Sequence, residues 1–447
     1  MAAPIAILGG GLAGLSAALE LADGDAGAPL CLIEAAAGLG GRARSLTARD
    51  IDRPIDNGQH ALSANYRHTR RMLERLGTAN LLTFQKRLDV TYLLGMGRRF
   101  RFRAWPVPAP FHFALALLWS APLSRRDRAW LRRFGLAFYR SDPESLKFRT
   151  VREWLRESGE APLLDALLWE PLTLATLNTP PERACAFLLY QVLKEAFLAS
   201  PGGSALGIPE AMLGELFADP ARRILNDRGV EIRTGTPVRE LALDDSGTRI
   251  AALRLRDGAM LPVSAVIAAL PPHALQRLVA ATPAINTVLD IPWERFTSSP
   301  IVTLYFWLEA SLPVRTPATL VDSPVQWIFR LPQRHQRPGE TGYSAVVSAA
   351  EREAALDDAA LRNLLIAELQ ARVSRQIRDA DLRAFKAVRE KRATFLQTPE
   401  AERARPTAPT AIANLFLAGD WTDTGLPATI EGAVLSGVRA AEALLGS

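Results

Sequence analysis

The chain begins with a short apolar run, a glycine cluster and a helical pattern. Residues 4–8 (PIAIL) predict a β-strand, GGGLAG follows at 9–14, and 12–22 has an apolar stripe at helical spacing. Residues 30–33 (LCLI) predict a second buried strand, which ends at Glu34. Strand, helix and strand in this order predict an α/β fold.

Further along, the pattern changes several times. After residue 123, helical periodicity dominates up to about residue 200, where the glycines of PGGSALG mark a boundary. Residues 215–290 alternate predicted strands and turns, and 299–350 is rich in β-type runs. The pattern ends with a helical stretch, a strand at 414–421 (NLFLAGDW) and a final helix from about Ala428.

The segment 104–123 (AWPVPAPFHFALALLWSAPL) carries no charge and is about as long as a bilayer span. Its prolines argue against a regular spanning helix. Aromatic residues within it and arginines on both flanks are typical of an element that dips into one leaflet. A buried helix is the alternative, and either version offers an apolar wall suited to a long hydrocarbon.

Composition narrows the function. The net charge is +6, nearly all the excess is arginine, and no nucleic-acid-recognition module accompanies it. We therefore expect no nucleic-acid partner and a mild preference for anionic lipid. Two cysteines and scattered histidines predict neither disulfides nor a metal. Because glycines break the apolar N-terminus, we expect no signal peptide, and a cytoplasmic protein peripherally associated with the inner face of the membrane.

The glycine cluster has the spacing of a dinucleotide-binding turn. Gly9 permits the tight turn, Gly11 lets the backbone approach a pyrophosphate, and Gly14 allows close helix–strand packing. The phosphate would lie at the start of the helix, at Leu12 and Ala13, where free N–H groups favour an anion. Glu34, at a strand end 20 residues past Gly14, is placed to accept hydrogen bonds from ribose hydroxyls.

Two further motifs favour FAD over NAD. In GLGGRARS (38–45), Gly41 precedes Arg42, whose guanidinium suits a pyrophosphate. In LFLAGDW (415–421), Gly419 lets the chain approach a ligand, and Asp420 can accept hydrogen bonds from ribityl hydroxyls. The following helix would direct its N-terminus at the flavin pyrimidine edge, through Ala428 and Thr429.

With these motifs, the sequence resembles the amine oxidase and phytoene desaturase superfamily of flavoproteins. Within it, the chain is similar to the squalene-associated FAD-dependent desaturases, whose members act as hydroxysqualene dehydroxylases in hopanoid biosynthesis. The stretches that carry the resemblance span nearly the whole chain: DNGQH (56–60), WEPLTLATLNTPPE (169–182), SPIVTLYFW (299–307), EKRATF (390–395) and GDWTDTGLPATIEGAV (419–434). The resemblance also implies that the backbone at Val238 contacts adenine.

The resemblance implies a reductive loss of an allylic hydroxyl from an isoprenoid substrate, with squalene as product. Such a reaction needs a proton donor and a water-poor chamber. His60 and Asp423 are the candidate donors. Three alternatives stay open: a carotenoid or phytoene-type desaturase, an amine or porphyrinogen oxidase, and a non-enzymatic flavin scaffold that holds a prenyl-synthase partner at the membrane.

These predictions combine into a domain plan. We expect a discontinuous Rossmann-like FAD-binding domain made of 1–75, 206–285 and 395–447. A mixed helix-plus-sheet substrate domain is inserted into it, with a helical, membrane-facing region at 76–205 and a sheet at 286–394.

Overall fold

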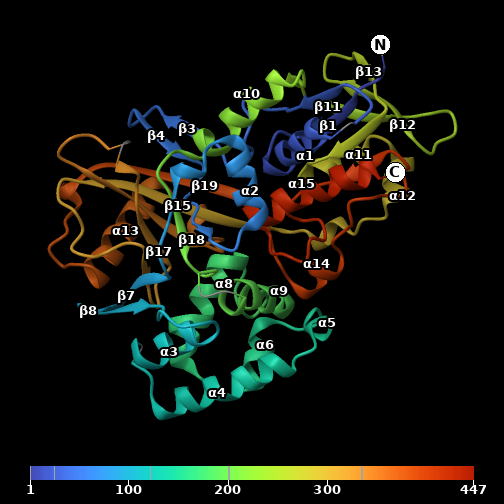
Figure 1. Ribbon diagram of the computed structural model, residues 1–447. Coiled ribbons are helices and arrows are strands. Elements are labelled where there is room, and N and C mark those ends of the chain that lie inside the picture. Colours follow the sequence, from blue (N-terminus) through green and yellow to red (C-terminus); the bar gives the residue numbers. More distant parts are fainter. Residues whose placement is uncertain (1, 25, 121, 200–201, 334–335, 447) are drawn as a thin grey trace.

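The structure, a computed structural model, describes residues 2–24, 26–120, 122–199, 202–333 and 336–446. The end of the molecule that holds both termini contains a five-stranded parallel sheet in the order β10-β2-β1-β14-β20 (Figure 1). Numbered along the chain, this order is 3-2-1-4-5, that of a doubly wound dinucleotide-binding fold. The strands are β1 Ile5–Leu8, β2 Leu30–Ile33, β10 Glu231–Arg233, β14 Ala265–Ala268 and β20 Leu415–Leu417.

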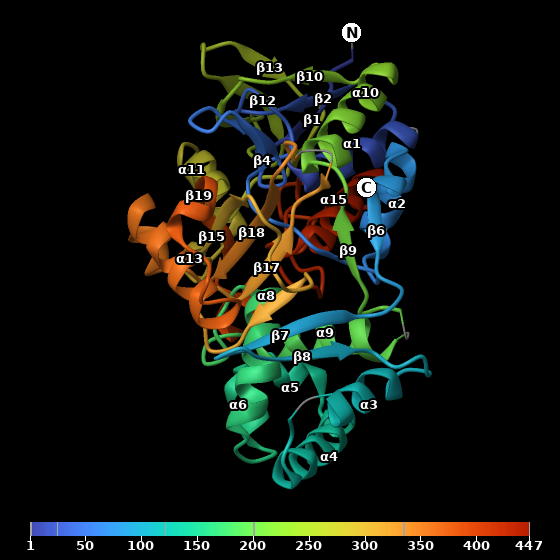
Figure 2. The same cartoon turned by 90° about the vertical axis from the view of Figure 1, so that its left-hand side faces the viewer.

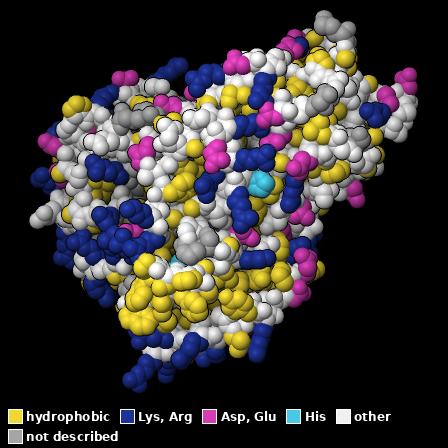
Figure 3. Space-filling model, viewed as in Figure 1, with side chains coloured by type: hydrophobic (Ala, Val, Ile, Leu, Met, Phe, Trp, Pro, Cys, Tyr) yellow, Lys and Arg dark blue, Asp and Glu magenta, His cyan; other side chains and the backbone are white. Residues whose placement is uncertain are grey.

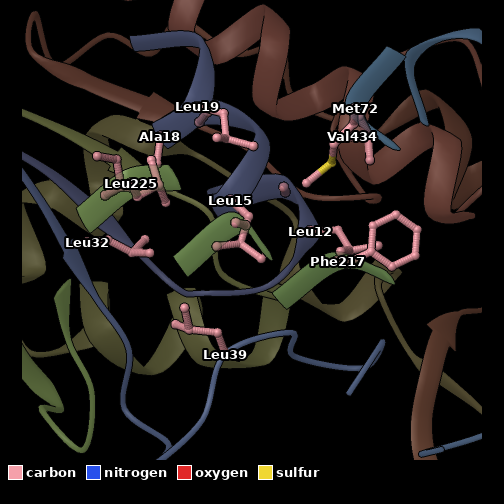
Figure 4. Close-up of a cluster of buried hydrophobic side chains, with 14 of the residues drawn as sticks. Leu12, Leu15, Ala18, Leu19, Leu32, Leu39, Met72, Phe217, Leu225 and Val434 are labelled. Atoms are coloured by element: carbon pink, nitrogen blue, oxygen red, sulfur yellow. The ribbon is translucent and has the colours of Figure 1, made fainter. Parts of the chain in front are cut away.

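Both faces of this sheet are covered, which explains why its strands are continuously apolar. Ile5 and Ile7 point to the helical side, formed by α1 Leu12–Asp23, α2 Arg67–Leu76, α10 Asp219–Asp227 and α15 Ile430–Leu445. Figure 4 shows side chains of α1, among them Leu12 and Leu15, in this cluster. Ala6 and Leu8 point to the other side. The elements there include β11 Val238–Leu243, β12 Ile250–Leu255, α11 Pro272–Ala280 and α12 Pro283–Leu289.

A seven-stranded sheet, in the order β19-β15-β18-β17-β16-β7-β8, forms the second layer (Figure 2). Helix α13, Asp358–Arg372, packs against it. The strands are β7 Asp89–Gly95, β8 Arg98–Arg103, β15 Ser298–Leu308, β16 Ala318–Leu320, β17 Trp327–Arg330, β18 Thr341–Ser348 and β19 Leu382–Phe395.

Helices at the far end of the molecule from the N-terminus form the third layer (Figure 1). Their core is aromatic: Trp130 stacks on Phe134, and Phe134 contacts Trp154 and Trp169. The helices are α3 Phe111–Ser120, α4 Arg125–Arg140, α5 Pro143–Leu146, α6 Val151–Arg156, α7 Pro162–Leu164, η2 Asp165–Trp169, α8 Glu170–Leu177, α9 Ala186–Val192 and η3 Leu193–Leu198.

Short elements complete the chain. They are β3 Ser45–Ala48, β4 Arg53–Asp56, β5 Leu62–Ser63, β6 Leu82–Phe84, β9 Leu206–Pro209, η4 Gly214–Ala218, β13 Met260–Pro262 and α14 Pro399–Arg403, with 3-10 turns η1 Ala79–Leu81, η5 Trp293–Arg295, η7 Glu353–Ala355 and η8 Asp379–Asp381. Within the described ranges, no helix is long and apolar enough to cross a membrane.

Three sequence predictions differ from this structure. The stretch 82–103, expected to be helical, forms strands, because arginine and phenylalanine alternate along β8 and only the phenylalanines face inward. Strands and turns were expected throughout 215–290, where helices α10, α11 and α12 also lie. Helix α15 begins at Ile430, after the expected start at Ala428. The parallel sheet does take strands from all three stretches assigned to the FAD domain; the boundaries of the domain plan stay a prediction.

Candidate active site

The turn between β1 and α1 is shaped to hold a pyrophosphate. Gly9 has a left-handed φ of 104°, and a Cβ on Gly14 would lie 1.9 Å from the carbonyl oxygen of Gly9. At Gly11 an added Cβ would meet nothing nearer than the Cα of Gly41, at 3.9 Å, so this side of the turn is open. No side chain caps α1, so the helix start at Leu12 and Ala13 directs its positive dipole end toward this opening.

Glu34 lies beside this turn, at the carboxyl end of β2. Its carboxylate accepts hydrogen bonds from the N–H groups of Gly10 and Ala36, each at 2.7 Å. The backbone of Thr236 donates to the Glu34 carbonyl oxygen at 3.0 Å, which brings the start of β11, at Val238, to the same edge. The expected ribose and adenine contacts therefore share the carboxyl edge of the parallel sheet, where ligands bind in such folds.

Arg42 forms an ion pair with Asp420. Its two Nη atoms donate to the two carboxylate oxygens of Asp420 at 2.9 and 2.7 Å, and Nη1 also donates to the Ala393 carbonyl oxygen at 2.7 Å. The Asp420 side chain is 7% exposed and that of Arg42 37%. Two residues expected to contact FAD separately thus form one bidentate pair. The guanidinium of Arg42 thus binds the Asp420 carboxylate, whereas the sequence predicted that it binds a pyrophosphate.

The loop after β20 is held by backbone and side-chain contacts. Gly419 has a φ of 142°, and its N–H donates to Ser436 Oγ at 2.8 Å. The side chain of Thr429 caps α15 by accepting from the Gly432 N–H at 3.3 Å. The N–H of Ala428 donates to Gln397 Oε1 at 2.8 Å. Ala428 therefore precedes the helix and already has a protein acceptor, which corrects the expectation that its N–H is free for a flavin.

A buried arginine, Arg405, holds the same loop through hydrogen bonds to its backbone. The Arg405 side chain has no exposed surface and pairs with Glu402 at 2.9 Å. It also donates to the carbonyl oxygens of Thr422 and Leu426, at 2.9 and 2.8 Å, and lies within 3.3 Å of the Asp420 carbonyl oxygen. Because one rigid guanidinium satisfies several loop carbonyls, Arg405 determines the path of the loop that carries Asp420.

Two histidines lie close enough to Arg42 for its positive charge to lower their pKa values. His60 donates from Nδ1 to the Gly58 carbonyl oxygen at 2.9 Å, and burial, together with Arg42, lowers the pKa of His60. Burial, followed by the charges of Arg392, Arg277 and Arg42, lowers the pKa of His273 to about 4. Both imidazoles are therefore neutral at pH 7, and Nε2 of His60 is left as an acceptor.

Asn57 and Glu390 complete this group. Asn57 Nδ2 donates to Glu390 Oε2 at 2.7 Å. Burial lowers the pKa of Arg42, but Asp420 and, to a smaller extent, Glu390 raise it above its usual value. Glu390 lies on β19 and Asn57 lies in the loop after β4. Their hydrogen-bonded side chains therefore lie beside the ion pair of Arg42 and Asp420.

Asp423 does not join this group. It is exposed, its carboxylate accepts from the Gly425 N–H at 3.2 Å, and its charge acts on Lys147. A turn at the surface explains Asp423 without any proton transfer, so the structure does not support its role as a donor. Nor do the described residues contain a group of three or more His, Cys, Asp or Glu that could hold a metal ion.

Comparison with known proteins agrees with this geometry. Residues 12–445 match the family model described as flavin containing amine oxidoreductase. The chain belongs to this flavin oxidoreductase family. It is an FAD-dependent enzyme, and the open glycine turn, the Glu34 carboxylate and the Asp420 loop fit the cofactor.

Curated relatives of this flavin oxidoreductase extend over its whole length. A hydroxysqualene dehydroxylase of Rhodopseudomonas palustris is 32% identical over 100% of this chain and 99% of its own, and one of Zymomonas mobilis is 30% identical over 98% of each. A 15-cis-phytoene desaturase of Synechococcus elongatus is 24% identical over 99% of this chain and 95% of its own. These matches confirm the resemblance seen in the sequence.

Solved structures show the fold of the flavin oxidoreductase. A putrescine oxidase double mutant has a TM-score of 0.72 at 16% identity, covering 100% of this chain and 99% of its own. Cyclohexylamine oxidase from Brevibacterium oxydans has a TM-score of 0.71 at 17% identity, covering 99% of each chain. At such low identity they confirm the α/β fold class and say nothing about substrate.

The FAD contacts expected from the sequence of this flavin oxidoreductase stay a prediction, and the sequence missed several residues that pack around them. Side chains from other segments form hydrogen bonds with the loop after β20, and no sequence motif marks them. They are Arg405, Gln397 and Ser436. His273 lies in the first turn of α11, five residues after the end of β14 in the motif LPPH, and this place near the carboxyl edge of the sheet could have drawn attention to it.

Proposed function

We propose that this flavoenzyme replaces the hydroxyl group of hydroxysqualene with hydrogen, which gives squalene, a step of hopanoid biosynthesis. The observation that carries the proposal is the full-length similarity to two hydroxysqualene dehydroxylases, whereas the amine oxidases share only the fold. Bound FAD in its reduced form supplies the hydride, so that each turnover releases one water and leaves the flavin oxidised.

The elements next to the cofactor residues are suited to an apolar substrate. Added to Gly58, a Cβ would lie 3.6 Å from Thr303 Oγ1 on β15 and 3.9 Å from the ring of His60. Strand β15 thus runs beside the segment that bears His60, and most of its side chains are buried and apolar. Val302, Leu304 and Phe306 of this strand pack toward α13, so the proposal assigns to its Thr303 side the chamber that keeps water from recapturing an allylic cation as the hydroxyl departs.

His60 is the residue that we assign to the proton. Its Nδ1 is fixed by the Gly58 carbonyl oxygen, which orients the ring and leaves Nε2 for the substrate hydroxyl. To act as donor, the imidazole must first take up a proton at Nε2. Its lowered pKa makes the protonated form a strong acid, and only a small fraction of the enzyme carries it at pH 7.

The substrate reaches the site from a membrane surface through α3. Phe111 and Trp119 are 61% and 66% exposed, and Trp119 lies 5.5 Å from the ring of Trp105, while Ala116 and Leu117 fix the opposite side of the helix. Figure 3 shows a broad hydrophobic patch at this end of the molecule, with Lys and Arg side chains beside it. We assign the patch to peripheral attachment at the inner face of the membrane, where a prenyl synthase would supply the substrate.

Product analysis tests the reaction. Chemically reduced enzyme, kept anaerobic, should convert hydroxysqualene to squalene and return the flavin to its oxidised spectrum. With flavin deuterated at N5 in deuterated buffer, squalene should gain one deuterium on the carbon skeleton. If reduced enzyme leaves hydroxysqualene unchanged while oxidised enzyme desaturates a C40 polyene, the enzyme is a desaturase.

Liposome flotation tests the membrane surface separately. Phe111→Asp with Trp119→Asp should abolish binding to vesicles and leave bound FAD unchanged. Met260→Asp with Val288→Asp is the matched control, because these side chains are 48% and 45% exposed on β13 and α12, at the opposite end of the molecule from α3 (Figure 1). Unchanged binding of the α3 variant would remove the membrane assignment and leave the reaction untouched.

A further inference from the structure

We infer that a basic groove beside α3 binds the phosphate of an anionic phospholipid headgroup. The groove has a volume of about 270 Å³, and it is lined by Gln85, Lys86, Arg87, Asp89, Arg103, Arg315 and Thr316. The inference rests on the proposed membrane attachment through α3, and is independent of the reaction that the enzyme catalyses.

The groove and the apolar face of α3 meet at Ala104. Arg87 Nη1 donates to the Ala104 carbonyl oxygen at 3.2 Å, and the Ala104 N–H donates to the Leu88 carbonyl oxygen at 2.9 Å. The next residue is Trp105, whose ring lies against Trp119. A molecule with a charged head and apolar chains can therefore contact the groove and the aromatic face together.

Sheet pairing brings the cations of the groove together from distant segments. Lys86 and Arg87 precede β7, and Arg103 ends β8, its antiparallel partner. Arg315 precedes β16, which pairs with β7 in parallel, and the Thr91 N–H donates to the Pro317 carbonyl oxygen at 3.1 Å. Figure 2 shows that β7 and β8 lie directly above α3 in that view.

The charges of the groove do not balance internally. Its one carboxylate, that of Asp89, already accepts from Arg101 and lies 3.7 Å from Arg103 Nε. Lys86 and Arg315 are exposed and have no carboxylate partner among the described residues. Excess guanidinium and ammonium donors around a concave surface are complementary to a phosphate group.

The neighbouring apolar face favours a headgroup over free phosphate as occupant. A free ion gains only the charge contacts, whereas a phospholipid also buries its acyl chains next to Trp105 and Trp119. Basic residues close to an anionic membrane strengthen binding by roughly fivefold each at ordinary salt. Three added cations are thus expected to strengthen binding on the order of 100-fold.

Vesicle binding provides the test, with holoenzyme and vesicles of phosphatidylcholine alone or with one third phosphatidylglycerol. Wild type should bind the anionic vesicles more tightly, and Lys86→Gln/Arg87→Gln/Arg315→Gln should lose most of that gain. The double variant Lys86→Gln/Arg315→Gln keeps the Arg87–Ala104 contact, and guards against misfolding. Arg223→Gln/Arg249→Gln/Arg256→Gln is the control of equal charge, placed on or beside α10 and β12 at the opposite end of the molecule (Figure 1).

Each outcome decides one point. If only the groove variants lose the tighter binding to anionic vesicles, and they still bind neutral vesicles as wild type does, the headgroup site is supported. An equal loss in the control shows that net charge is responsible and overturns the groove. Competition by millimolar inorganic phosphate as strong as that by anionic vesicles identifies a free-phosphate site and overturns the headgroup. If wild type binds neither kind of vesicle, the proposed membrane attachment through α3 is wrong. This conclusion does not depend on the result of the product analysis.

Discussion

Arg42 and Asp420 are 378 residues apart in the chain and are joined by two hydrogen bonds of 2.9 and 2.7 Å. Arg42 follows the first βαβ unit, and Asp420 follows the last strand of the parallel sheet. The pair therefore closes the FAD-binding part of the molecule across the large insertion between its segments. Because the Asp420 carboxylate is nearly buried, its negative charge depends on Arg42 for compensation.

We expect Arg42→Ala to lower both the stability and FAD retention. Removing the guanidinium leaves a buried carboxylate unpaired, at a cost of about 2 kcal/mol, less than for a fully buried pair because the Arg42 side chain is 37% exposed. Urea unfolding of Arg42→Ala, Asp420→Ala and the double variant measures the coupling. Arg44→Gln, an exposed neighbour, is the control. Additive losses would show that the pair contributes nothing of its own.

Gly11 and Gly14 should respond oppositely to added side chains. Gly11→Val should fold and lose FAD, since its Cβ meets only open space in the protein but occupies the region of the pyrophosphate. Gly14→Ala should destabilise the fold itself, because its Cβ would lie 1.9 Å from a backbone oxygen. Circular dichroism and flavin absorbance separate the two effects. Full FAD occupancy in Gly11→Val would refute the phosphate position.

Burial of Arg405 leads to a third expectation. Arg405→Ala should destabilise the protein by about 3–5 kcal/mol, because it leaves Glu402 and several loop carbonyls without a donor. Arg405→Lys should recover only part of this, since an ammonium lacks the planar fork. Released flavin fluorescence and thermal unfolding are the measurements. Arg403→Ala, at an exposed position on α14, should show little change; equal losses in both variants would contradict a specific clamp.

These residues show what sequence can and cannot predict here. The glycine turn, Glu34 and Gly419 were found because local backbone geometry demands particular residues at fixed spacing. The pairing of Arg42 with Asp420 could not be predicted, nor could the contacts of Arg405 with the loop after β20. Both are tertiary contacts between distant segments, and no periodic pattern in a single sequence indicates such contacts. Strands β7 and β8 were missed because β8 alternates arginine with phenylalanine at a sheet edge, inside a region that is otherwise helical.

Asp56 should make stability depend on pH. Burial raises the pKa of this carboxyl to about 6, although Ser45 and the Leu213 N–H stabilise its anion. The folded state therefore holds its proton to higher pH than the unfolded chain, and the free energy of unfolding falls as pH rises from about 4 through 6, by on the order of 2–3 kcal/mol. Asp56→Asn should remove this slope in denaturant titrations, whereas Asp227→Asn, an exposed carboxylate on α10, should keep it.

The pH dependence of turnover tests His60. Because burial and Arg42 lower its pKa, the protonated imidazole is scarce at pH 7, and a rate limited by proton donation should increase as pH falls below the ordinary histidine range. His60→Ala should lower single-turnover rates of reduced enzyme by about 10²–10⁴-fold and abolish the increase. Asp423→Asn should match wild type, since that carboxylate lies at the surface. A rate that stays high in His60→Ala with an unchanged profile would exclude His60 as donor. His273 would then be the group to replace, because its pKa of about 4 predicts a rate that rises as the pH falls toward that value.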